Sequence, residues 1–436
     1  MSTSPPASAQ PWIRRMVSRD DSTTHRPSTN LELLFDLTFV VAVAAIAREL
    51  AHSLADGHYA HGLVGYVMVF FAIWWAWMNF TWFASAYDTD DVPYRLLTLL
   101  QMGGVLVLAA GVPNAFENTD FTAVTIGYVI MRVAMVGQWL RAASSDPGHR
   151  PTCLRYAAGI SLVQAGWVAR LALPDSLAVA GFVVLALGEV LVPAIAERPG
   201  MTTWHPEHIA ERYGLFTIIV LGECVTQAAG AMENAYSDHG FSAKLAVTAT
   251  GGLVLLFGLW WLYFVVPQGQ RLRERRQLAF AWGYGHLLVF SSLAAVAAGL
   301  EVTLESLAGH GEAARVAISP VAVALTVAIP VAIYLVVHGG LCAALSPASE
   351  PPLPVVAIGA ASCVAAALTA HWLPIAVTGL LVTLPVGLLV AHSVYSAHRN
   401  GELGRPEPVE EKPRGPRMMN PGPRGPVSSP STFRPP

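Results

Sequence analysis

Twelve long apolar runs, separated by short polar turns, dominate this sequence of 436 residues. A helix needs about 17 to 25 apolar residues to cross the roughly 30 Å hydrocarbon core of a bilayer, and every run reaches that length. Hydrophobic residues make up 54% of the chain and charged residues only 13%, which is too few charges to cover a soluble fold. The runs occupy residues 31–50, 62–84, 95–112, 121–142, 153–172, 174–196, 209–229, 244–266, 278–300, 315–341, 353–371 and 373–395.

These runs are predicted to be helical, because an open strand in lipid leaves its backbone N–H and C=O groups without hydrogen-bond partners. We therefore expect an all-α, polytopic integral membrane protein with about twelve transmembrane helices. Residues 1–30 form a polar segment before the first span, and they contain no apolar stretch typical of a signal peptide. Residues 400–436 are rich in Pro, Arg and Gly, a composition typical of a disordered tail.

The sequence favours lipid as the main partner, together with a small solute or an ion. The net charge is only −3 and the basic residues do not gather on one face, which argues against nucleic-acid binding. The four cysteines show neither CxxC nor Cys/His spacing, and there is no Walker A, GxGxxG or GxSxG motif. Two histidine groups lack a metal-binding frame such as HExxH, so no metal or cofactor is predicted: His52, His58 and His61, and His205 and His208 with Glu211.

Arginines cluster in alternate turns, and cationic loops remain on the cytoplasmic side of a membrane. Both termini are therefore predicted to be cytoplasmic. The clusters comprise Arg14, Arg15, Arg19 and Arg26, then Arg141, Arg150 and Arg155, then Arg271, Arg273, Arg275 and Arg276, and finally the tail.

Three landmarks recur in the same order and at nearly the same offset, which suggests an internal duplication. They are ELLFDLT at 32–38 and ERYGLFT at 211–217, the Trp pairs at 74–75 and 260–261, and the AAG triplets at 109–111 and 297–299. The predicted halves are 31–196 and 209–395, with six helices each. Because six is even, the halves share one orientation, as in many transporters.

Ionisable residues within spans are costly, at about 3 kcal/mol each at the bilayer centre, so they are candidates for a binding site. Glu32 and Asp36 lie four residues apart and share a helix face, although an interfacial acidic first turn explains them equally well. Glu223 lies twelve residues beyond Glu211 and is the strongest candidate.

Three further ionisable residues fall inside predicted spans. Arg132 is expected to pair with Glu189, Glu223 or Asp36, in either a structural or a functional ion pair. His286 is either a proton acceptor or a hydrogen-bonded core histidine.

Two cytoplasmic turns carry opposite charge. One contains Asp88, Asp90 and Asp91, followed by Arg95, and the other contains Arg271, Arg273 and Arg275. They are predicted either to pair across the halves or to remain two independently solvated loops. The tryptophans near these turns are predicted to form an interfacial belt: Trp74, Trp75, Trp77, Trp82, Trp260 and Trp261.

The ordered motifs LELLFDLTFVVAV, WWAWMNFTWFASAYDTDDVPYR, ERYGLFTIIVLGE, WWLYF and YGHLLVF resemble the bacterial low temperature requirement protein A family over residues 25–395. The resemblance implies a multi-pass protein of the bacterial inner membrane, without an established substrate. It maps the family motifs onto Glu32, Phe35 and Asp36, onto Asp88, Asp90, Asp91 and Arg95, and onto Glu211, Arg212, Gly214, Gly222 and Glu223. Val265 stands where the family usually carries an acid.

The leading hypothesis is a secondary transporter or ion-coupled permease for a small solute. Glu223 would be the coupling or binding carboxylate, Asp36 a gate on the cytoplasmic side or a second acid, and Arg132 the counter-ion. The alternatives are a membrane-embedded enzyme acting on lipid or isoprenoid substrates, with His286 in acid–base chemistry, and a non-catalytic cold-adaptation factor. A cation channel is the last alternative, from a weaker likeness at Phe35 and Asp36 to two-repeat channels.

Overall fold

The computed structural model of the protein describes residues 12–19, 26–240, 242–308, 318–346 and 351–399. Within these residues the secondary structure is entirely helical. The helices are α1 (Asn30–Ala55), α2 (Tyr59–Tyr87), α3 (Val92–Ala110), α4 (Val112–Glu117), α5 (Thr122–Ser145), α6 (Arg150–Arg170), α7 (Asp175–Ala196), α8 (Pro206–His239), α9 (Ala243–Phe264), α10 (Gln268–Glu274), η1 (Arg276–Leu278), α11 (Ala279–Ala308), α12 (Pro320–Leu345), α13 (Leu353–Leu368), η3 (Thr369–His371) and α14 (Ile375–Arg399).

The prediction of a helical, multi-pass membrane protein is supported by the number of long apolar helices. Of the described helices, eleven are long and apolar enough to cross a bilayer. The remaining long helix is α6, which has 21 residues and carries Arg150, Arg155 and Arg170. Each predicted run overlaps one of these twelve long helices, while the short helices α4 and α10 were not predicted. The predicted disordered tail at 400–436 lies outside the described residues.

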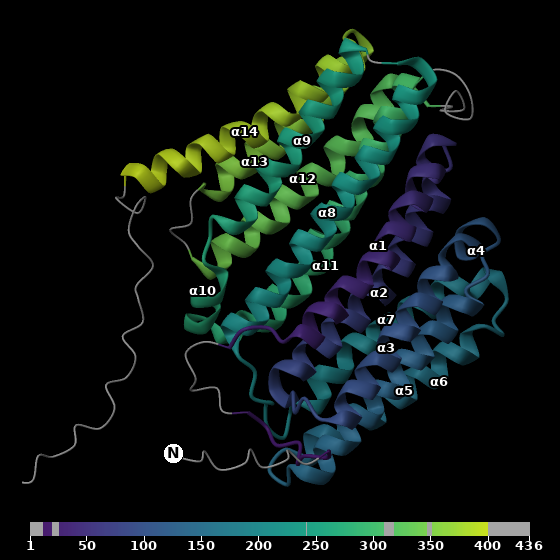
Figure 1. Ribbon diagram of the computed structural model, residues 1–436, viewed down its shortest axis with the longest axis vertical. Helices are drawn as coiled ribbons and strands as arrows, with labels where there is room; N and C mark the ends of the chain where they lie inside the picture. The colour runs from purple at the N-terminus through teal and green to yellow at the C-terminus, as the bar shows by residue number, and fades with distance from the viewer. Residues whose placement is uncertain (1–11, 20–25, 241, 309–317, 347–350, 400–436) are drawn as a thin grey trace, which may run out of the picture. The chain divides into compact units, whose positions relative to one another are not determined.

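The long helices form two groups in chain order, and α1 lies where the groups meet (Figure 1). In the first group α3 packs on α1 and α5, and α6 packs on α5 and α7. In the second group α11 packs on α8 and α12, and α13 packs on α12. Helix α1 contacts both α8 and α11. The facing surfaces of α1, α8 and α11, which we call the seam, therefore join the two groups.

Apolar side chains cover the outer face of several helices, as expected where lipid replaces water. On α7 the exposed residues follow a helical spacing, and Val184 and Leu187 are 67% and 59% exposed. A polar solvent would make such a continuous apolar face costly, whereas acyl chains do not. These faces therefore indicate contact with the hydrocarbon core.

The predicted tryptophan belt is wrong for the first group. Trp74, Trp75 and Trp77 are at most 1% exposed and lie in the interior of the helical bundle. The indole N–H groups of Trp75 and Trp77 donate to buried carboxylates, which the sequence pattern could not reveal. Trp260 and Trp261 are 43% and 41% exposed, as residues at a lipid-facing surface would be.

Glycine allows two pairs of helices to cross at backbone contact. A Cβ atom at Gly127 of α5 would lie 2.4 Å from the backbone nitrogen of Leu108 in α3, and one at Gly104 would lie 2.7 Å from the Gly127 carbonyl oxygen. In the second group, a Cβ atom at Gly299 of α11 would lie 2.4 Å from the Thr326 carbonyl oxygen in α12. Small residues at such crossings are typical of membrane helix packing.

Replacing Gly104 by alanine should destabilise the protein by about 1–3 kcal/mol, because the new methyl group forces α3 away from α5. Its neighbour Gly103 provides the matched control, since a Cβ atom there meets nothing within 4 Å. Gly103→Ala should leave the melting temperature unchanged or raise it, because alanine is the better helix former. Equal melting temperatures for the two variants in detergent would contradict this close crossing.

Candidate functional site

A network of buried charges lies at the start of α1 and α8; we call Glu32, Asp36, Trp77, His208 and Arg212 the Arg212 cluster. Thr29 caps α1, and its backbone N–H donates to Glu32 Oε2 at 2.8 Å. The other oxygen, Oε1, lies 3.2 Å from His208 Nε2 and 3.3 Å from Arg212 Nη1. Glu32 therefore has two roles. It is the acidic residue in the first turn of α1, as one interpretation of the sequence held, and it also belongs to a buried ion pair.

Asp36 and Arg212 form a two-point ion pair across the seam. Arg212 Nε donates to Asp36 Oδ2 at 2.7 Å and Nη2 donates to Oδ1 at 2.6 Å. The indole N–H of Trp77 in α2 donates to the same Oδ1 at 2.7 Å. Both Asp36 and Arg212 are completely buried, so each charge depends on the other for compensation. This pair fastens α1, α2 and α8 together.

Residues of the N-terminal segment extend this network to the aspartate turn. Arg26 Nη2 lies 3.2 Å from Glu32 Oε1 and 3.1 Å from Asp88 Oδ2, and Arg19 lies 3.3 Å from Asp88. Burial raises the pKa of Asp88, and the nearby Glu32 adds to the rise against the two arginines. Arg19 and Arg26 therefore connect the start of α1 to the turn after α2.

Arg132 and Glu189 form a second buried pair, one of the three partnerships predicted from sequence. Arg132 Nη2 donates to Glu189 Oε2 at 3.1 Å. Trp75 also donates to Oε2 (2.9 Å), while Tyr128 and Trp167 donate to Oε1 (2.7 and 3.2 Å). Four donors saturate the carboxylate, which leaves no position for a substrate. The geometry thus favours a structural pair, and Arg132 does not serve Asp36 or Glu223 as a counter-ion.

Glu223 lies in a group of charges at the far end of the seam; we call Arg48, Glu49, Glu223, Glu301 and Glu305 the Glu223 cluster. Glu223 is half-buried and accepts a hydrogen bond from Gln227 Nε2 at 3.1 Å. Gln227 also donates to the Ala44 carbonyl oxygen of α1 at 3.3 Å. Glu301 interacts electrostatically with Glu305, Arg48, Glu223 and Glu49. The carboxylates outnumber the arginine, so this end of the seam attracts cations.

His286 lies apart from both clusters and is a core histidine. Its Nδ1 lies 2.8 Å from the Trp282 carbonyl oxygen and must carry the proton there, because a carbonyl only accepts. Its Nε2 then accepts from the Tyr263 hydroxyl at 3.1 Å. The ring is completely buried, with both nitrogens satisfied, which supports the core reading over an acid–base role.

The predicted pairing between the two cytoplasmic turns is replaced by other partners. Asp91 pairs with Arg141 (2.7 Å) and Asp90 pairs with Arg95 (2.7 Å). On the arginine turn, Arg273 pairs with Glu207 of α8, and Arg275 donates to the Ala344 carbonyl oxygen (3.0 Å). Each turn is thus held by residues that do not belong to the opposite turn.

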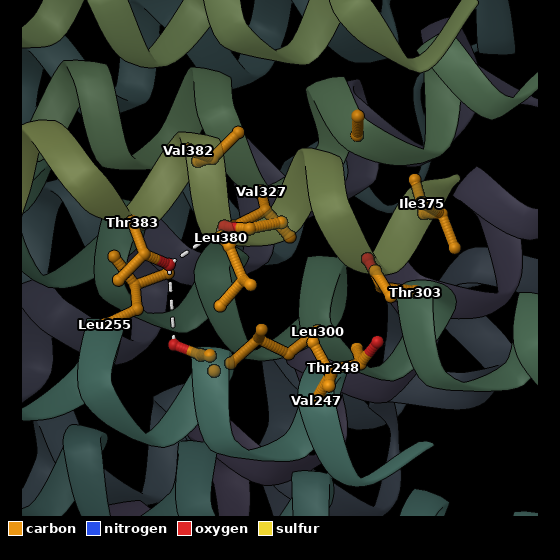
Figure 2. Close-up of a pocket in the computed structure, with 15 residues that line it drawn as sticks. Val247, Thr248, Leu255, Leu300, Thr303, Val327, Ile375, Leu380, Val382 and Thr383 are labelled. Carbon is orange, nitrogen blue, oxygen red and sulfur yellow. Dashed lines mark hydrogen bonds between the residues drawn. The ribbon is translucent and has the colours of Figure 1, made fainter. Parts of the chain in front are cut away.

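An apolar pocket lies among α9, α11, α12 and α14 (Figure 2). Leu255, Leu300, Val327 and Leu380 line it, and the Thr383 hydroxyl hydrogen bonds only to backbone carbonyls of Gly251 and Gly379. The pocket contains no charged side chain, so it offers an ionic substrate no anchor. Among the described residues, no group of three His, Cys, Asp or Glu side chains is placed to hold a metal ion.

The sequence reasoning did not foresee the pairing of Arg212, and it did not single out Glu301 or Glu197. Arg212 lies at the edge of an apolar run, and it is 176 residues from the aspartate that it neutralises. Glu301 sits near the end of α11, beyond the predicted span 278–300. Glu197 ends α7 and accepts hydrogen bonds from Tyr156 and Thr202. One signal for Arg212 was present in the sequence, since the motif ERYGLFT that contains it was matched to the acidic motif ELLFDLT of α1.

Comparison with known proteins places this arrangement in a family. The model of the bacterial low temperature requirement A protein (LtrA) matches residues 27–391, which include both charged clusters. The chain belongs to the LtrA family. It is also 28% identical over 316 residues to an uncharacterized protein of Rhizobium meliloti (strain 1021), covering 67% of this chain and 72% of that protein. The family resemblance seen in the sequence is therefore confirmed.

Replacing Arg212 by methionine should lower the free energy of unfolding by about 3–5 kcal/mol, because Asp36 is left charged and buried. Asp36→Asn in the same background should recover part of that loss, since it removes the uncompensated charge. Arg95→Gln, at an exposed pair with Asp90, should leave the melting temperature unchanged. Thermal unfolding in detergent measures the stability of all three variants. A double variant Arg212→Met/Asp36→Asn that is less stable than Arg212→Met alone would contradict the pairing.

Asp91 should stabilise the protein in a pH-dependent way. Burial alone raises the pKa of Asp91, but hydrogen bonds from the backbone N–H groups of Arg14 and Tyr94 and from Arg141 outweigh it and hold the pKa below its ordinary value. A lowered carboxyl pKa contributes stability above about pH 4, and that contribution is lost as the pH falls through the folded-state pKa.

Asp91→Asn should therefore cost about 1 kcal/mol at neutral pH, because the charge-assisted hydrogen bond from Arg141 becomes a bond to a neutral amide. The variant should also lose less stability on acidification than the wild type. Asp90→Asn provides the comparison, because the Asp90 side chain is 43% exposed and solvent weakens its pair with Arg95, so its effect on acid stability should be smaller. The positive φ of 48° at this position is one that asparagine tolerates. Melting curves between pH 3 and pH 7 measure the difference. If the melting temperatures of Asp91→Asn and the wild type fall equally steeply towards acidic pH, Asp91 does not contribute this pH-dependent stability.

Proposed function

We propose that this LtrA-family protein is a secondary transporter that moves a small solute together with protons or a monovalent cation. The observation that carries the proposal is the distribution of charge along one seam. The Arg212 cluster lies at one end, the Glu223 cluster lies at the other, and a packed aromatic layer separates them. A closed middle between two polar ends fits alternating access, in which one helical group rocks against the other and opens each end in turn.

The aromatic layer consists of Trp77, Tyr213, Phe216 and Phe290, contributed by α2, α8 and α11. Ring centroids lie 4.4 Å apart for Trp77 and Phe216, and 4.9 Å apart for Phe216 and Phe290. All four rings are at most 1% exposed. Rings packed this closely leave no water path between the clusters, so a solute crosses only if the helices of the seam move.

The two ends of the seam differ in how tightly their charges are held. At the Arg212 end, Asp36 accepts three hydrogen bonds within 2.7 Å and is fully buried. At the Glu223 end, Glu223 is half-buried and its described side-chain hydrogen bond comes from a neutral amide. Uptake of a proton or cation relieves the repulsion among Glu223, Glu301 and Glu305. We therefore assign coupling to Glu223 and the closed gate to Asp36 and Arg212.

The packing order of the helices supports a duplicated architecture for this transporter. In the first group the chain places α1 against α3, α3 against α5 and α5 against α6. In the second group it places α8 against α11, α11 against α12 and α12 against α13. The same order of neighbours is expected from two parallel repeats, whose first helices α1 and α8 meet at the seam. We place both termini in the cytoplasm, on the side rich in arginine.

Purified protein in liposomes should dissipate an imposed pH gradient when its solute is present, reported by a trapped pH-sensitive dye. Glu223→Gln should reduce that flux at least tenfold, because the side chain no longer exchanges a proton. Glu233→Gln, at an exposed position on the same helix, is the matched control and should transport normally.

The liposomes should be tested with panels of amino acids, sugars, organic acids and amines under an inside-negative potential. Flux that is equal in Glu223→Gln and in the wild type would remove Glu223 from the mechanism. A steady current that does not depend on any solute would indicate a channel instead. Protein-containing liposomes no more permeable than empty ones under every gradient would contradict transport altogether.

A further inference from the structure

A further site lies away from the seam, in a pocket where seven of the thirteen lining residues are aromatic. It sits among α2, α5, α6, α7, α11 and the connection from α7 to α8. We call it the aromatic pocket, and its rings are those of Trp82, Phe83, Trp139, Tyr156, Trp204, Phe280 and Tyr284. Neither charged cluster contributes to it, so it requires its own explanation.

The rings face the pocket from several sides and brace one another. Trp139 and Tyr156 stack with centroids 4.1 Å apart and planes inclined by 4°. Trp82 lies 4.9 Å from Trp204 and 6.3 Å from Phe280. The pocket opens past Phe280 and Met201, which are 38% and 54% exposed. The walls are therefore held in place while the entrance remains accessible.

One carboxylate, Glu197, lines this aromatic pocket. The Tyr156 hydroxyl donates to Oε1 at 2.9 Å, the Thr202 hydroxyl donates to Oε1 at 2.9 Å, and the Thr202 backbone N–H donates to Oε2 at 2.7 Å. These three donors are neutral, whereas Asp36 and Glu189 each accept from an arginine. A carboxylate has about four acceptor positions, so Glu197 is fixed in place with capacity to spare.

We infer that the aromatic pocket binds an alkylammonium group, with Glu197 as the counter-charge and the surrounding rings as the cage. The faces of Trp and Tyr rings attract cations, and cages of such rings are the usual recognition element for quaternary ammonium ligands. The pocket already shows this property at its edge, where Arg276 lies 5.5 Å from the Trp204 ring centroid. Within the pocket, the Glu197 carboxylate and the negative faces of the rings disfavour an anion.

The position of the pocket along the helices allows two sources for this group. Glu197 follows the last residue of α7, Trp204 precedes α8 and Phe280 is the second residue of α11. The pocket thus lies where helices end, at the level of lipid headgroups. A free organic cation and the headgroup of a choline or ethanolamine lipid share the required chemistry. Binding at this pocket does not depend on the transport proposed for the seam.

Choline and its neutral isostere 3,3-dimethylbutan-1-ol test the inference on unmodified protein in detergent. Choline should raise the melting temperature in a saturable manner, above the effect of sodium chloride at equal ionic strength. The isostere has the same shape without the charge and should produce no comparable shift. Equal shifts from both compounds, or none from choline, would overturn the inference without any variant.

Variants then place the binding at the pocket. Glu197→Gln should weaken the choline response at least tenfold in midpoint concentration, whereas Glu233→Gln should respond as the wild type does. Phe280→Ala should weaken it several-fold, and Phe280→Tyr should restore it because the ring remains. An unchanged midpoint in both Glu197→Gln and Phe280→Ala would overturn the assignment to this pocket.

Native mass spectrometry of the protein released from nanodiscs distinguishes the two sources. Retention of phosphatidylcholine or phosphatidylethanolamine over phosphatidylglycerol, lost in Glu197→Gln, would identify a lipid headgroup. A choline response without selective lipid retention would identify a free cation. Both outcomes support an alkylammonium site, and retention of phosphatidylglycerol alone would contradict it.

Discussion

The ion pair between Asp36 and Arg212 is the interaction on which the association of the two helical groups depends. Each partner is fully buried, and each would carry an uncompensated charge if the other withdrew. Breaking such a pair costs several kcal/mol, because neither lipid nor the aromatic layer offers a replacement. Trp77 and the capped start of α1 then fix the carboxylate in one position. This ion pair and the Trp77 hydrogen bond therefore hold α1, α2 and α8 together at this end of the bundle.

The three carboxylate environments differ in what their donors leave available. Glu189 is saturated by four donors, including Arg132, and serves the packing of the first group. Asp36 is neutralised across the seam, so its state is linked to the separation of α1 and α8. Glu197 and Glu223 receive their described side-chain hydrogen bonds from neutral donors and remain partly accessible. The environments of Glu189 and Asp36 favour permanent ion pairs, whereas the shared environment of Glu197 and Glu223 leaves acceptor positions for a ligand.

Sequence periodicity was sufficient to predict the long helices, since the cost of bare backbone in lipid leaves helix as the only solution. The cost of a charge inside a span also predicted that Arg132 requires an acidic partner, and Glu189 was among the three candidates. It did not predict Arg212 as the partner of Asp36, because contacts between residues so far apart depend on tertiary packing. The indoles of Trp75 and Trp77 were misplaced for the same reason: amphipathic rings suit either a membrane interface or a buried carboxylate. Composition alone does not distinguish these environments.

The crossing of α11 and α12 at Gly299 has a consequence for how α12 bends. Pro330 lies inside α12 and has no N–H, so the carbonyl of Thr326, four residues earlier, lacks its usual helical donor. That oxygen is the atom which the backbone of Gly299 approaches. The Gly299 backbone therefore lies beside the carbonyl oxygen that the proline leaves without a helical donor. Any larger residue at Gly299 would press directly on this turn, so the shape of α12 is tied to a glycine of its neighbour.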